Sequence, residues 1–532
     1  MKIYKFLFVL SLFGFFPQHG YSQSADLIKS LETFQSFLYQ VDRFYVDTIQ
    51  VDDLVEKGMV EILSQLDPHS VYIPEDEVKR MNEPLQGNFE GIGVQFNILR
   101  DTILVVATIS GGPSEKIGIQ AGDRFVTIEK EEVAGISIQN SDVIKRLRGK
   151  KGTTVNVKIA RRGEKDLLDF AIVRDKIPIF SVDAGYMASP KTGYIKVNRF
   201  SATTLEEFKE QFSELEAQGM KNLILDLQGN GGGYLNTAHD LVDELLAKDK
   251  LVVYTEGKSF PRENLVTRRN GAFEKGRLVV LIDESSASAS EIVAGAVQDW
   301  DRGLIVGRRS FGKGLVQRGY NLPNGAQFRL TVSRYYTPSG RSIQKPYDQG
   351  EEAYRKEKYE RFSSGELFSS DSISFPDSLK YETNNKRIVY GGGGITPDFF
   401  VPLDTSQTSD FFSLLVRKGV LNQFTLDYTN DGRKKLLKKY DSVENFAKKF
   451  KTEDIIEELK EYTDNAGIKW DDEGYATSQL WIQTRVKAFI ARNLWDTEAF
   501  YVIINDLNKS YQEALQLIEG KDYNEFKLTS KI

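Results

Sequence analysis

The chain has 532 residues, of which 40% are hydrophobic and 27% are charged, and its formal net charge is −6. This composition predicts an ordinary globular protein with several domains, and the acidic balance without a basic stripe argues against nucleic-acid binding. The sequence contains no cysteine, which excludes disulfides, thiolate metal sites and a cysteine nucleophile, and its three histidines are too few for a multi-histidine metal site.

Residues 1–24 have the pattern of a secretory signal peptide. Lys2 and Lys5 precede an apolar run at 6–16, and small residues follow at Gly20, Ser22 and Ser24. The run is too short to span a bilayer comfortably. We therefore predict an exported protein of the periplasm or cell envelope, which would be membrane-tethered if this N-terminus stays uncleaved.

Residues 25–85 predict a helical region, because apolar residues recur on one face at 27, 31, 34 and 38 and again between 54 and 66. His69 follows Pro68 in a turn near the end of this region. A histidine in a turn needs only one backbone partner, so we favour a structural role for His69 over a catalytic one.

Residues 86–174 predict a β-rich module, with strands at 103–109 and 154–160 and a helix at 140–147. The module begins with FEGIGV at 89–94. A Gly-Ile-Gly sequence is by itself typical of a plain turn, but it also lets successive amides converge on a carboxylate while a peptide adds as a strand. Together with residues 112–123 the segment resembles a PDZ domain, which implies that Gly91, Ile92, Gly93 and Val94 bind the free, apolar C-terminus of a peptide.

Residues 178–405 predict alternating strands and helices, with strands at 193–200, 222–227, 251–254 and 277–283 and helices at 203–218 and 235–246. The loop QGNGGG at 228–233 joins a strand to a helix. The dinucleotide fingerprint fits Gly229 and Gly231 but finds Tyr234 where a third glycine is needed for close helix packing. We therefore do not favour a dinucleotide site.

Two segments within this region carry candidate chemistry. Ser288 begins a predicted helix, where outward-pointing amides and the helix dipole stabilise a developing oxyanion. Lys313 stands between two glycines, and burial of such a lysine would lower its pKa and make it a general base. A serine beside a neutral lysine is a known pairing of nucleophile and base.

Simpler readings of both segments stay open. Ser288 and Glu291 have capping-box spacing, so Ser288 could be only an N-cap, and Ser285, Ser286 and Ser290 compete for the nucleophile's role. A lone lysine is usually a solvated cation. The stretch 307–313 also fits the phosphate-binding pattern G-x-x-x-x-G-K, but a glycine follows where that loop needs Ser or Thr, and the next residues predict a strand. A histidine-based serine hydrolase would have to use His69 or His239.

In combination, these segments resemble the carboxyl-terminal processing peptidases, or tail-specific proteases, a family of serine–lysine peptidases. The resemblance runs through SASASE at 286–291, FGKG at 311–314 and YTPSGRSIQ at 336–344. It implies that Ser288 is the nucleophile, Lys313 the base and Gln317 the residue that orients the lysine. The block DLQGNGGG at 226–233 implies an oxyanion hole from an amide of Gly232 or Gly233 with that of Ala289, although Gln228 and Gly231 replace the usual arginine and proline. The resemblance also implies that neither a metal nor a cofactor is required.

The resemblance also implies the fold class: a multidomain α/β protein whose crotonase-like ββα peptidase core carries an inserted PDZ domain. The predicted divisions are a signal peptide at 1–24, an N-terminal helical region at 25–85, the PDZ domain at 86–174, the peptidase core at 178–405 with a mobile polar insertion at about 348–390, and a C-terminal helical domain at 410–532. The basic stretch at 433–451 is interpreted as a solvated helical face.

The predicted function is a serine endopeptidase that cleaves exported proteins from near their C-termini. Its partners would be proteins or peptides with free, apolar C-termini, and its helical ends leave self-association into a homo-oligomer open. The alternative is a catalytically inert PDZ scaffold that binds protein C-termini. The presence of Ser288, Lys313 and Gln317 together favours the enzyme.

Overall fold

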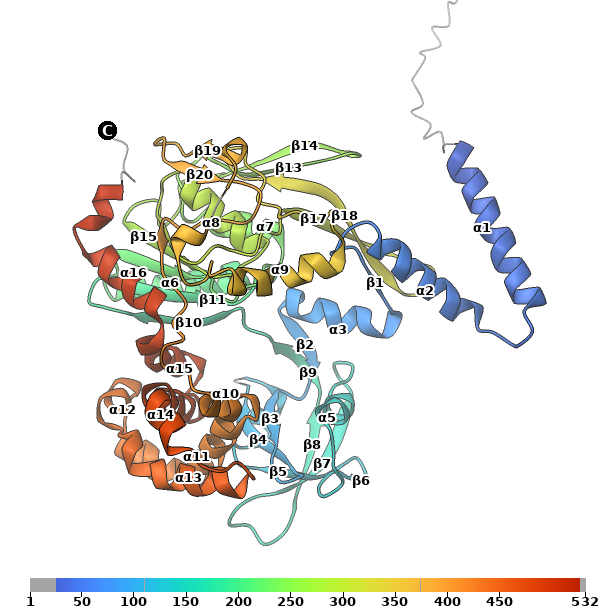
Figure 1. The fold of residues 1–532 in the computed structure, drawn as a ribbon. Coiled ribbons are helices and arrows are strands. Elements are labelled where there is room, and N and C mark those ends of the chain that lie inside the picture. The colour runs from blue at the N-terminus through green and yellow to red at the C-terminus, as the bar shows by residue number, and fades with distance from the viewer. Residues whose placement is uncertain (1–24, 110, 374, 527–532) are drawn as a thin grey trace, which may run out of the picture. The chain divides into compact units, whose positions relative to one another are not determined.

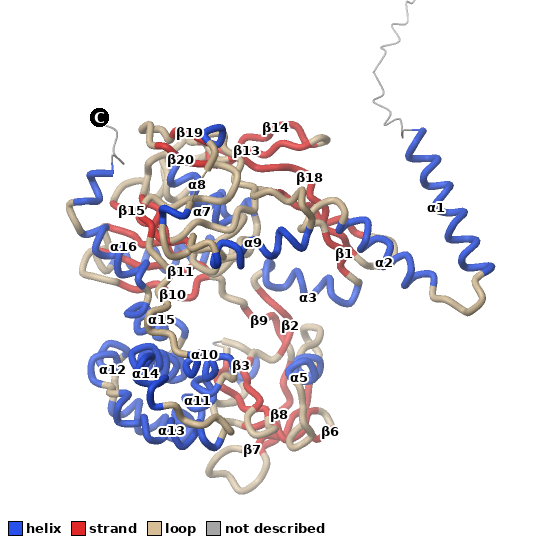
Figure 2. The backbone as a smooth tube through the Cα atoms, viewed as in Figure 1, coloured by secondary structure: helices blue, strands red, loops and turns tan. Residues whose placement is uncertain are grey.

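The computed structural model describes residues 25–109, 111–373 and 375–526, so the predicted signal peptide lies outside the described residues. Figure 1 shows their helices and strands in chain order, and Figure 2 separates the two kinds of element by colour. Contacts divide the chain into two units, Met1–Gln65 and Leu66–Ile532. The first contains two helices, α1 (Ala25–Phe44) and α2 (Val51–Ser64), as the apolar periodicity predicts.

The second unit begins with a strand that the prediction of a purely helical region missed. Strand β1 (Val71–Ile73) precedes helix α3 (Glu75–Gln86) and pairs antiparallel with a strand more than 250 residues later. The three residues of β1 are β-branched or aromatic, which favours a strand, but three residues are too few to show a period.

The PDZ region is a five-stranded antiparallel sheet with one short extra strand. Its strands lie in the order β3-β4-β5-β7-β8, with β6 on β5, so β3 is an edge strand. The predicted strands at 103–109 and 154–160 and the helix at 140–147 are confirmed to within a residue. The elements are β2 (Asn88–Gly91), β3 (Val94–Ile98), β4 (Ile103–Thr108), α4 (Pro113–Lys116), β5 (Arg124–Ile128), β6 (Glu131–Glu132), α5 (Asn140–Leu147), β7 (Thr154–Ala160), β8 (Leu168–Val173) and β9 (Asp175–Pro178).

The peptidase core is built on a second sheet with the strand order β10-β11-β12-β15-β16-β21, in which only β10 runs antiparallel to its neighbour. The predicted β/α alternation is confirmed. The elements are β10 (Val182–Met187), β11 (Thr192–Val197), α6 (Thr204–Ala217), β12 (Asn222–Asp226), α7 (Leu235–Val242), β15 (Arg277–Ile282), α8 (Ala289–Asp299), β16 (Leu304–Gly307) and β21 (Phe399–Phe400).

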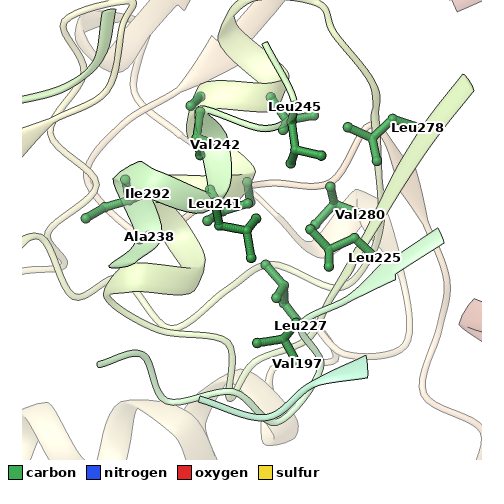
Figure 3. Close-up of a cluster of buried hydrophobic side chains, with 14 of the residues drawn as sticks. Val197, Leu225, Leu227, Ala238, Leu241, Val242, Leu245, Leu278, Val280 and Ile292 are labelled. Atoms are coloured by element: carbon green, nitrogen blue, oxygen red, sulfur yellow. The ribbon is translucent and has the colours of Figure 1, made fainter. Parts of the chain in front are cut away.

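One face of this sheet packs against α6, α7 and α8. Figure 3 shows Leu225 and Val280 of the strands facing Leu241 of α7, and Ile292 of α8 belongs to the same buried cluster. Successive strand residues point to opposite faces, so the alternate residues belong to a different cluster. Burial on both faces explains why the central strands are nearly continuous apolar runs.

The second face is covered by the last α-helix of the described chain, α16 (Lys509–Glu519). Tyr511 and Ile518 of this helix pack with Ile224 and Leu281 of the sheet in one buried cluster. The hydroxyl of Tyr523 also binds the backbone of Leu278, accepting from its N–H at 2.9 Å. The sequence did not indicate that this distant helix completes the core.

A smaller sheet stands beside the core and carries the segment that follows Lys313. Strand β18 (Gln327–Tyr336) pairs along its length with β17 (Leu315–Asn321) and at its two ends with β1 and β13 (Leu251–Gly257), while β14 (Phe260–Val266) pairs with β13. The register between β17 and β18 shifts at Val316 and Gln317, which is a β-bulge. Bulges re-aim side chains next to functional sites.

The polar insertion at 348–390 is not a loose surface segment. It contains helix α9 (Glu351–Ser363) and the pair β19 (Lys380–Glu382) and β20 (Ile388–Tyr390). Tyr354, Arg361 and Glu366 are buried, and the Arg361 guanidinium donates to the backbone carbonyls of Arg309 and Ser310 at 2.6 and 3.0 Å. The polar composition of the segment did not indicate this burial, because the buried Arg361 and Glu366 are charged residues that form hydrogen bonds with each other.

The C-terminal region is helical, as predicted, with an aromatic-rich core of its own. Its helices are α10 (Asp410–Arg417), α11 (Val420–Lys439), α12 (Val443–Lys449), α13 (Ile456–Asn465), α14 (Asp472–Leu494) and α15 (Thr497–Ile504). The basic stretch of α11 is mostly exposed, as expected for a solvated face, except that Arg433 donates to the Asn493 carbonyl at 2.5 Å. Within the described ranges, no helix is both long and apolar enough to cross a membrane.

The packing of α16 on the sheet can be tested by truncating one buried side chain. Ile518 is 0% exposed, so Ile518→Ala should lower the free energy of unfolding by about 2–5 kcal/mol, measured by urea denaturation. The control is Gln516→Ala, whose exposed side chain should change stability by no more than about 0.5 kcal/mol. Equal effects of the two variants would show that α16 does not belong to the core.

Candidate active site

Ser288 lies in the sharp turn between strand β15 and helix α8. The Ser286 hydroxyl holds this turn, since it donates to the Leu227 carbonyl at 2.8 Å and accepts the Asp283 N–H at 2.9 Å. Ser288 has φ 56° and ψ −114°, a conformation that costs a non-glycine residue about 1–3 kcal/mol. An ordinary N-cap residue has extended dihedral angles, so the strained backbone favours a nucleophile at a strand-to-helix turn over a simple cap.

The Glu291 carboxylate joins the start of α8 to the segment that carries Lys313. Glu291 is fully buried and accepts the N–H of Ser288 at 2.8 Å, the N–H of Gly312 at 2.7 Å and the N–H of Lys313 at 2.9 Å. The Ser310 hydroxyl donates to the same carboxylate at 2.5 Å. Burial raises the pKa of Glu291, and these hydrogen bonds oppose the rise because they stabilise the charged form.

Tyr335 of β18 makes a second connection between the same two backbones. Its hydroxyl lies 3.0 Å from the carbonyl oxygen of Ser288 and 2.6 Å from that of Lys313. The ring is 1% exposed. Ser288 and Lys313, which are 25 positions apart in the sequence, are therefore held together through both an acceptor and a donor.

Lys313 is partly buried, and the pKa of its amine is lowered mainly by burial and next by the positive charge of Arg329. Glu291 and Asp67 act in the opposite direction. The Lys313 amine has no hydrogen bond or ion pair within the described part of the chain, and none joins it to Ser288.

Gln317 lies at the bulge of β17, four residues after Lys313. Its side-chain amide donates to the Thr331 hydroxyl at 3.2 Å, and that hydroxyl donates to Asp67 at 3.0 Å. The structure thus brings Gln317 into the sheet that positions Lys313, but it shows no direct contact between the two side chains.

The glycine-rich loop packs directly against Ser288. A side chain at Gly232 would lie 2.7 Å from the Ser288 Cβ, and Gly232 has φ +101°, so this position requires glycine. The Gly232 N–H donates to the Asn230 side chain at 2.8 Å. The amides of Gly233 and Ala289, in contrast, have no hydrogen-bond partner among the described residues, so they are the better placed of the predicted oxyanion donors.

Asn230 is the residue that fixes this loop, and the sequence analysis did not single it out. Its side chain accepts from Gly232 and donates to the Val197 carbonyl at 2.9 Å. The backbone carbonyl oxygen of Asn230 accepts a hydrogen bond from the Ala287 N–H at 3.0 Å and another from the Ser290 hydroxyl at 2.9 Å. The glycine loop and the start of α8 are thereby tied together around one buried asparagine.

His69 lies closer to Lys313 than the sequence suggested. Its ring nitrogen Nε2 is 2.9 Å from the Tyr354 hydroxyl, so its partner is a side chain and not the backbone group that we expected. Burial, followed by the positive charge of Lys313, lowers the pKa of His69 to about 4. The ring is therefore neutral at neutral pH.

His239 is not placed to act as a base for Ser288. Its Nε2 is 2.9 Å from the Val266 carbonyl oxygen and its Nδ1 is 3.3 Å from Asp240, so both ring nitrogens have local partners. The side chain is buried on α7. This arrangement is that of a structural histidine.

The predicted carboxylate-binding loop lies between β2 and the edge strand β3. Gly91 ends β2 and pairs with β9, and Val94 begins β3. The amides of Ile92 and Gly93 have no partner among the residues that the structure describes, and Gly93 has φ +74°. The Ile92 carbonyl oxygen accepts hydrogen bonds from the backbone N–H and the hydroxyl of Ser114, which fixes the loop.

In the described ranges, no group of three or more potential metal ligands occurs.

Comparisons with known proteins define the class. The model of peptidase family S41 matches residues 191–349, and that of the PDZ domain matches residues 91–172. A family of unknown function matches residues 411–496. The protein is thus a serine peptidase with a PDZ domain, which confirms the predicted fold class.

Individual similar proteins narrow this class of serine peptidases further. Carboxy-terminal processing protease CtpB of Bacillus subtilis is 29% identical over 397 residues, or 74% of this chain and 80% of that protein. A carboxy-terminal-processing protease of Bartonella bacilliformis is 34% identical over 324 residues, which cover 59% of this chain and 73% of that protein. The solved photosystem II D1 C-terminal processing protease is 25% identical, covering 69% of this chain and 92% of that one, with a TM-score of 0.35. The chain belongs to the carboxy-terminal processing proteases of peptidase family S41.

The buried histidine makes stability depend on pH. The pKa of His69 is about 4 in the folded protein and about 6.5 when unfolded, so the unfolded chain binds the extra proton first. The contribution of His69 to the free energy of unfolding should be complete above about pH 6.5 and lost as the pH falls through 4. Urea denaturation of the wild type and of His69→Gln between pH 7 and pH 4 should show a smaller loss in the variant. Identical pH dependence in the two proteins would contradict the buried neutral ring.

Proposed function

We propose that the protein hydrolyses exported proteins near their C-termini, with Ser288 as nucleophile and Lys313 as general base. The observation that carries this proposal is the double connection made by Glu291 and Tyr335, each of which binds the backbones of both Ser288 and Lys313. The strained backbone of Ser288 and the lowered pKa of Lys313 support the same roles.

The reaction proceeds through an acyl-enzyme. The neutral Lys313 amine takes the proton of the Ser288 hydroxyl as its oxygen attacks the scissile carbonyl carbon. The amides of Gly233 and Ala289 donate to the resulting oxyanion, and Gly232 provides the space beside Ser288. The ammonium returns its proton to the leaving amine. A water molecule, deprotonated by the same lysine, then hydrolyses the ester and restores the serine.

The PDZ domain supplies the preference for C-termini in this proposal. The free amides of Ile92 and Gly93 would hold the terminal carboxylate, and the edge strand β3 would pair with the extended peptide. Val94 and Phe96 of β3 are partly buried against the domain core, next to where an apolar terminal side chain would lie. Export rests on the sequence pattern of residues 1–24, and an uncleaved N-terminus would tether the enzyme to the membrane.

Removal of either member of the proposed dyad should abolish catalysis. Ser288→Ala and Lys313→Ala should each lower kcat by several orders of magnitude, on the order of 10⁴-fold or more, as for residues that act as a unit. The measurement is hydrolysis of an unstructured fluorogenic peptide that ends in a free apolar residue. The control is Lys356→Ala, since Lys356 is 62% exposed and lies on α9. Turnover by purified Lys313→Ala at the wild-type rate would contradict the dyad, and an inactive wild type would favour the inert scaffold.

Peptide binding should depend on the terminal carboxylate. In the Ser288→Ala background, which prevents cleavage, a peptide ending in an apolar residue with a free carboxylate should bind about 10- to 100-fold more tightly than its C-terminal amide. The reason is the loss of charge-assisted hydrogen bonds to the amides of Ile92 and Gly93. Fluorescence anisotropy measures both dissociation constants, and equal values would exclude this loop as the carboxylate site.

A further inference from the structure

A chain of hydrogen bonds leads from Gln317 away from Lys313 and ends on Asp67. The Gln317 amide nitrogen donates to the Thr331 hydroxyl, and this hydroxyl donates to the Asp67 carboxylate. Thr331 is paired with Gln317 in the register of β17 and β18. Asp67 reaches the opposite edge of β18 because β1, which follows its turn closely, pairs with that strand.

The turn that carries Asp67 is rigid. One carboxylate oxygen accepts the N–H groups of His69 and Ser70 at 2.8 and 3.0 Å, and the other accepts the Ser70 hydroxyl at 2.6 Å. The Ser70 hydroxyl in turn accepts the Thr331 N–H at 3.1 Å. Asp67 is 8% exposed, so its carboxylate is shielded from solvent and fixed by four donors.

The chemistry of these groups gives the chain a single direction. A carboxylate only accepts hydrogen bonds, so the one hydroxyl hydrogen of Thr331 is committed to Asp67. The Thr331 oxygen can then only accept a hydrogen bond from Gln317. The amide nitrogen of Gln317, and not its oxygen, must therefore face Thr331. The Gln317 oxygen is left for another donor, and it has no partner among the described residues.

We propose that Asp67 and Thr331 are positioning residues for the lysine base, acting through the orientation of the Gln317 amide. With its nitrogen held by Thr331, Gln317 presents its oxygen as the acceptor for an N–H of Lys313, which leaves the lysine lone pair for the Ser288 proton. This inference rests on the proposed dyad and extends the site to the turn before β1.

Asp67 also acts on Lys313 through its charge. The charged or titratable groups that face this amine are Glu291 of α8, Arg329 of β18, and Asp67 and His69 of the turn. Asp67 stabilises the ammonium, so its removal should lower the pKa of Lys313 further. Thr331 carries no charge, and its replacement should leave that pKa in place. The two residues can therefore be distinguished by the pH dependence of the rate.

The test compares Thr331→Val with Thr331→Ser and with Asp67→Asn, using the fluorogenic peptide. Thr331→Val should lower kcat about 10- to 100-fold with little change in KM, because a displaced catalytic group costs rate and not peptide binding. Thr331→Ser keeps the hydroxyl and should restore most of the rate. The acid limb of the pH–rate profile should keep its position in Thr331→Val and move to lower pH in Asp67→Asn.

A double-mutant cycle decides whether Thr331 acts through Gln317. In the Gln317→Ala background, Thr331→Val should have almost no further effect, since the residue that it orients is gone. An unchanged kcat in Thr331→Val, or the same fold-loss in both backgrounds, would overturn the inference. Should Asp67→Asn fail to fold, the Thr331 variants still decide it. Active Lys313→Ala would instead refute the dyad, whereas inactive Lys313→Ala with a fully active Thr331→Val would refute only this extension.

Discussion

The active-site arrangement depends on one buried carboxylate. The Glu291 carboxylate accepts hydrogen bonds from three backbone amides and one hydroxyl group. These donors belong to two separate segments, the start of α8 and residues 310–313. Each of these donors would cost about 1–3 kcal/mol if it were left unsatisfied in the interior. The two segments therefore cannot separate without a large cost in free energy. The Glu291 hydrogen bonds thus fix how Ser288 and Lys313 lie relative to each other. The capping-box spacing that made Ser288 ambiguous in the sequence is the same feature that ties it to the base.

That carboxylate works only because distant parts of the chain hold its donors in place. Arg361 of α9 binds the carbonyl oxygens of Arg309 and Ser310, and the Glu366 carboxylate accepts from both Arg309 and Arg361. On the other side of the sheet, α16 covers the strands from which the catalytic loops emerge. The polar insertion and the C-terminal helix are thus structural parts of the peptidase core, and none of the candidate catalytic residues lies in either of them.

The sequence predicted what is encoded locally. Alternating apolar patterns located the strands and helices of the core and the PDZ domain, and the family resemblance of the segments that contain Ser288, Lys313 and Gln317 indicated the candidate site. It could not predict contacts between residues far apart, such as Asp67 with Thr331 or Tyr335 with Ser288. It also misjudged residues 348–390, because buried ion pairs have the composition of a solvated surface. Asn230 was overlooked for a similar reason: its role lies in four simultaneous hydrogen bonds, which leave no pattern in one sequence.

The surroundings of Lys313 favour the proposed role of this lysine as a base. The nearest carboxylates, Glu291 and Asp67, are saturated by backbone amides and hydroxyl groups, so neither forms an ion pair with the ammonium. Arg329, in contrast, has an asparagine and no carboxylate as its partner among the described residues, and its uncompensated charge opposes protonation of the lysine. His69 adds no second positive charge, because burial keeps it neutral. Burial removes water, and the two acids are held by other donors and form no ion pair with the amine, so the pKa of Lys313 lies below its ordinary value.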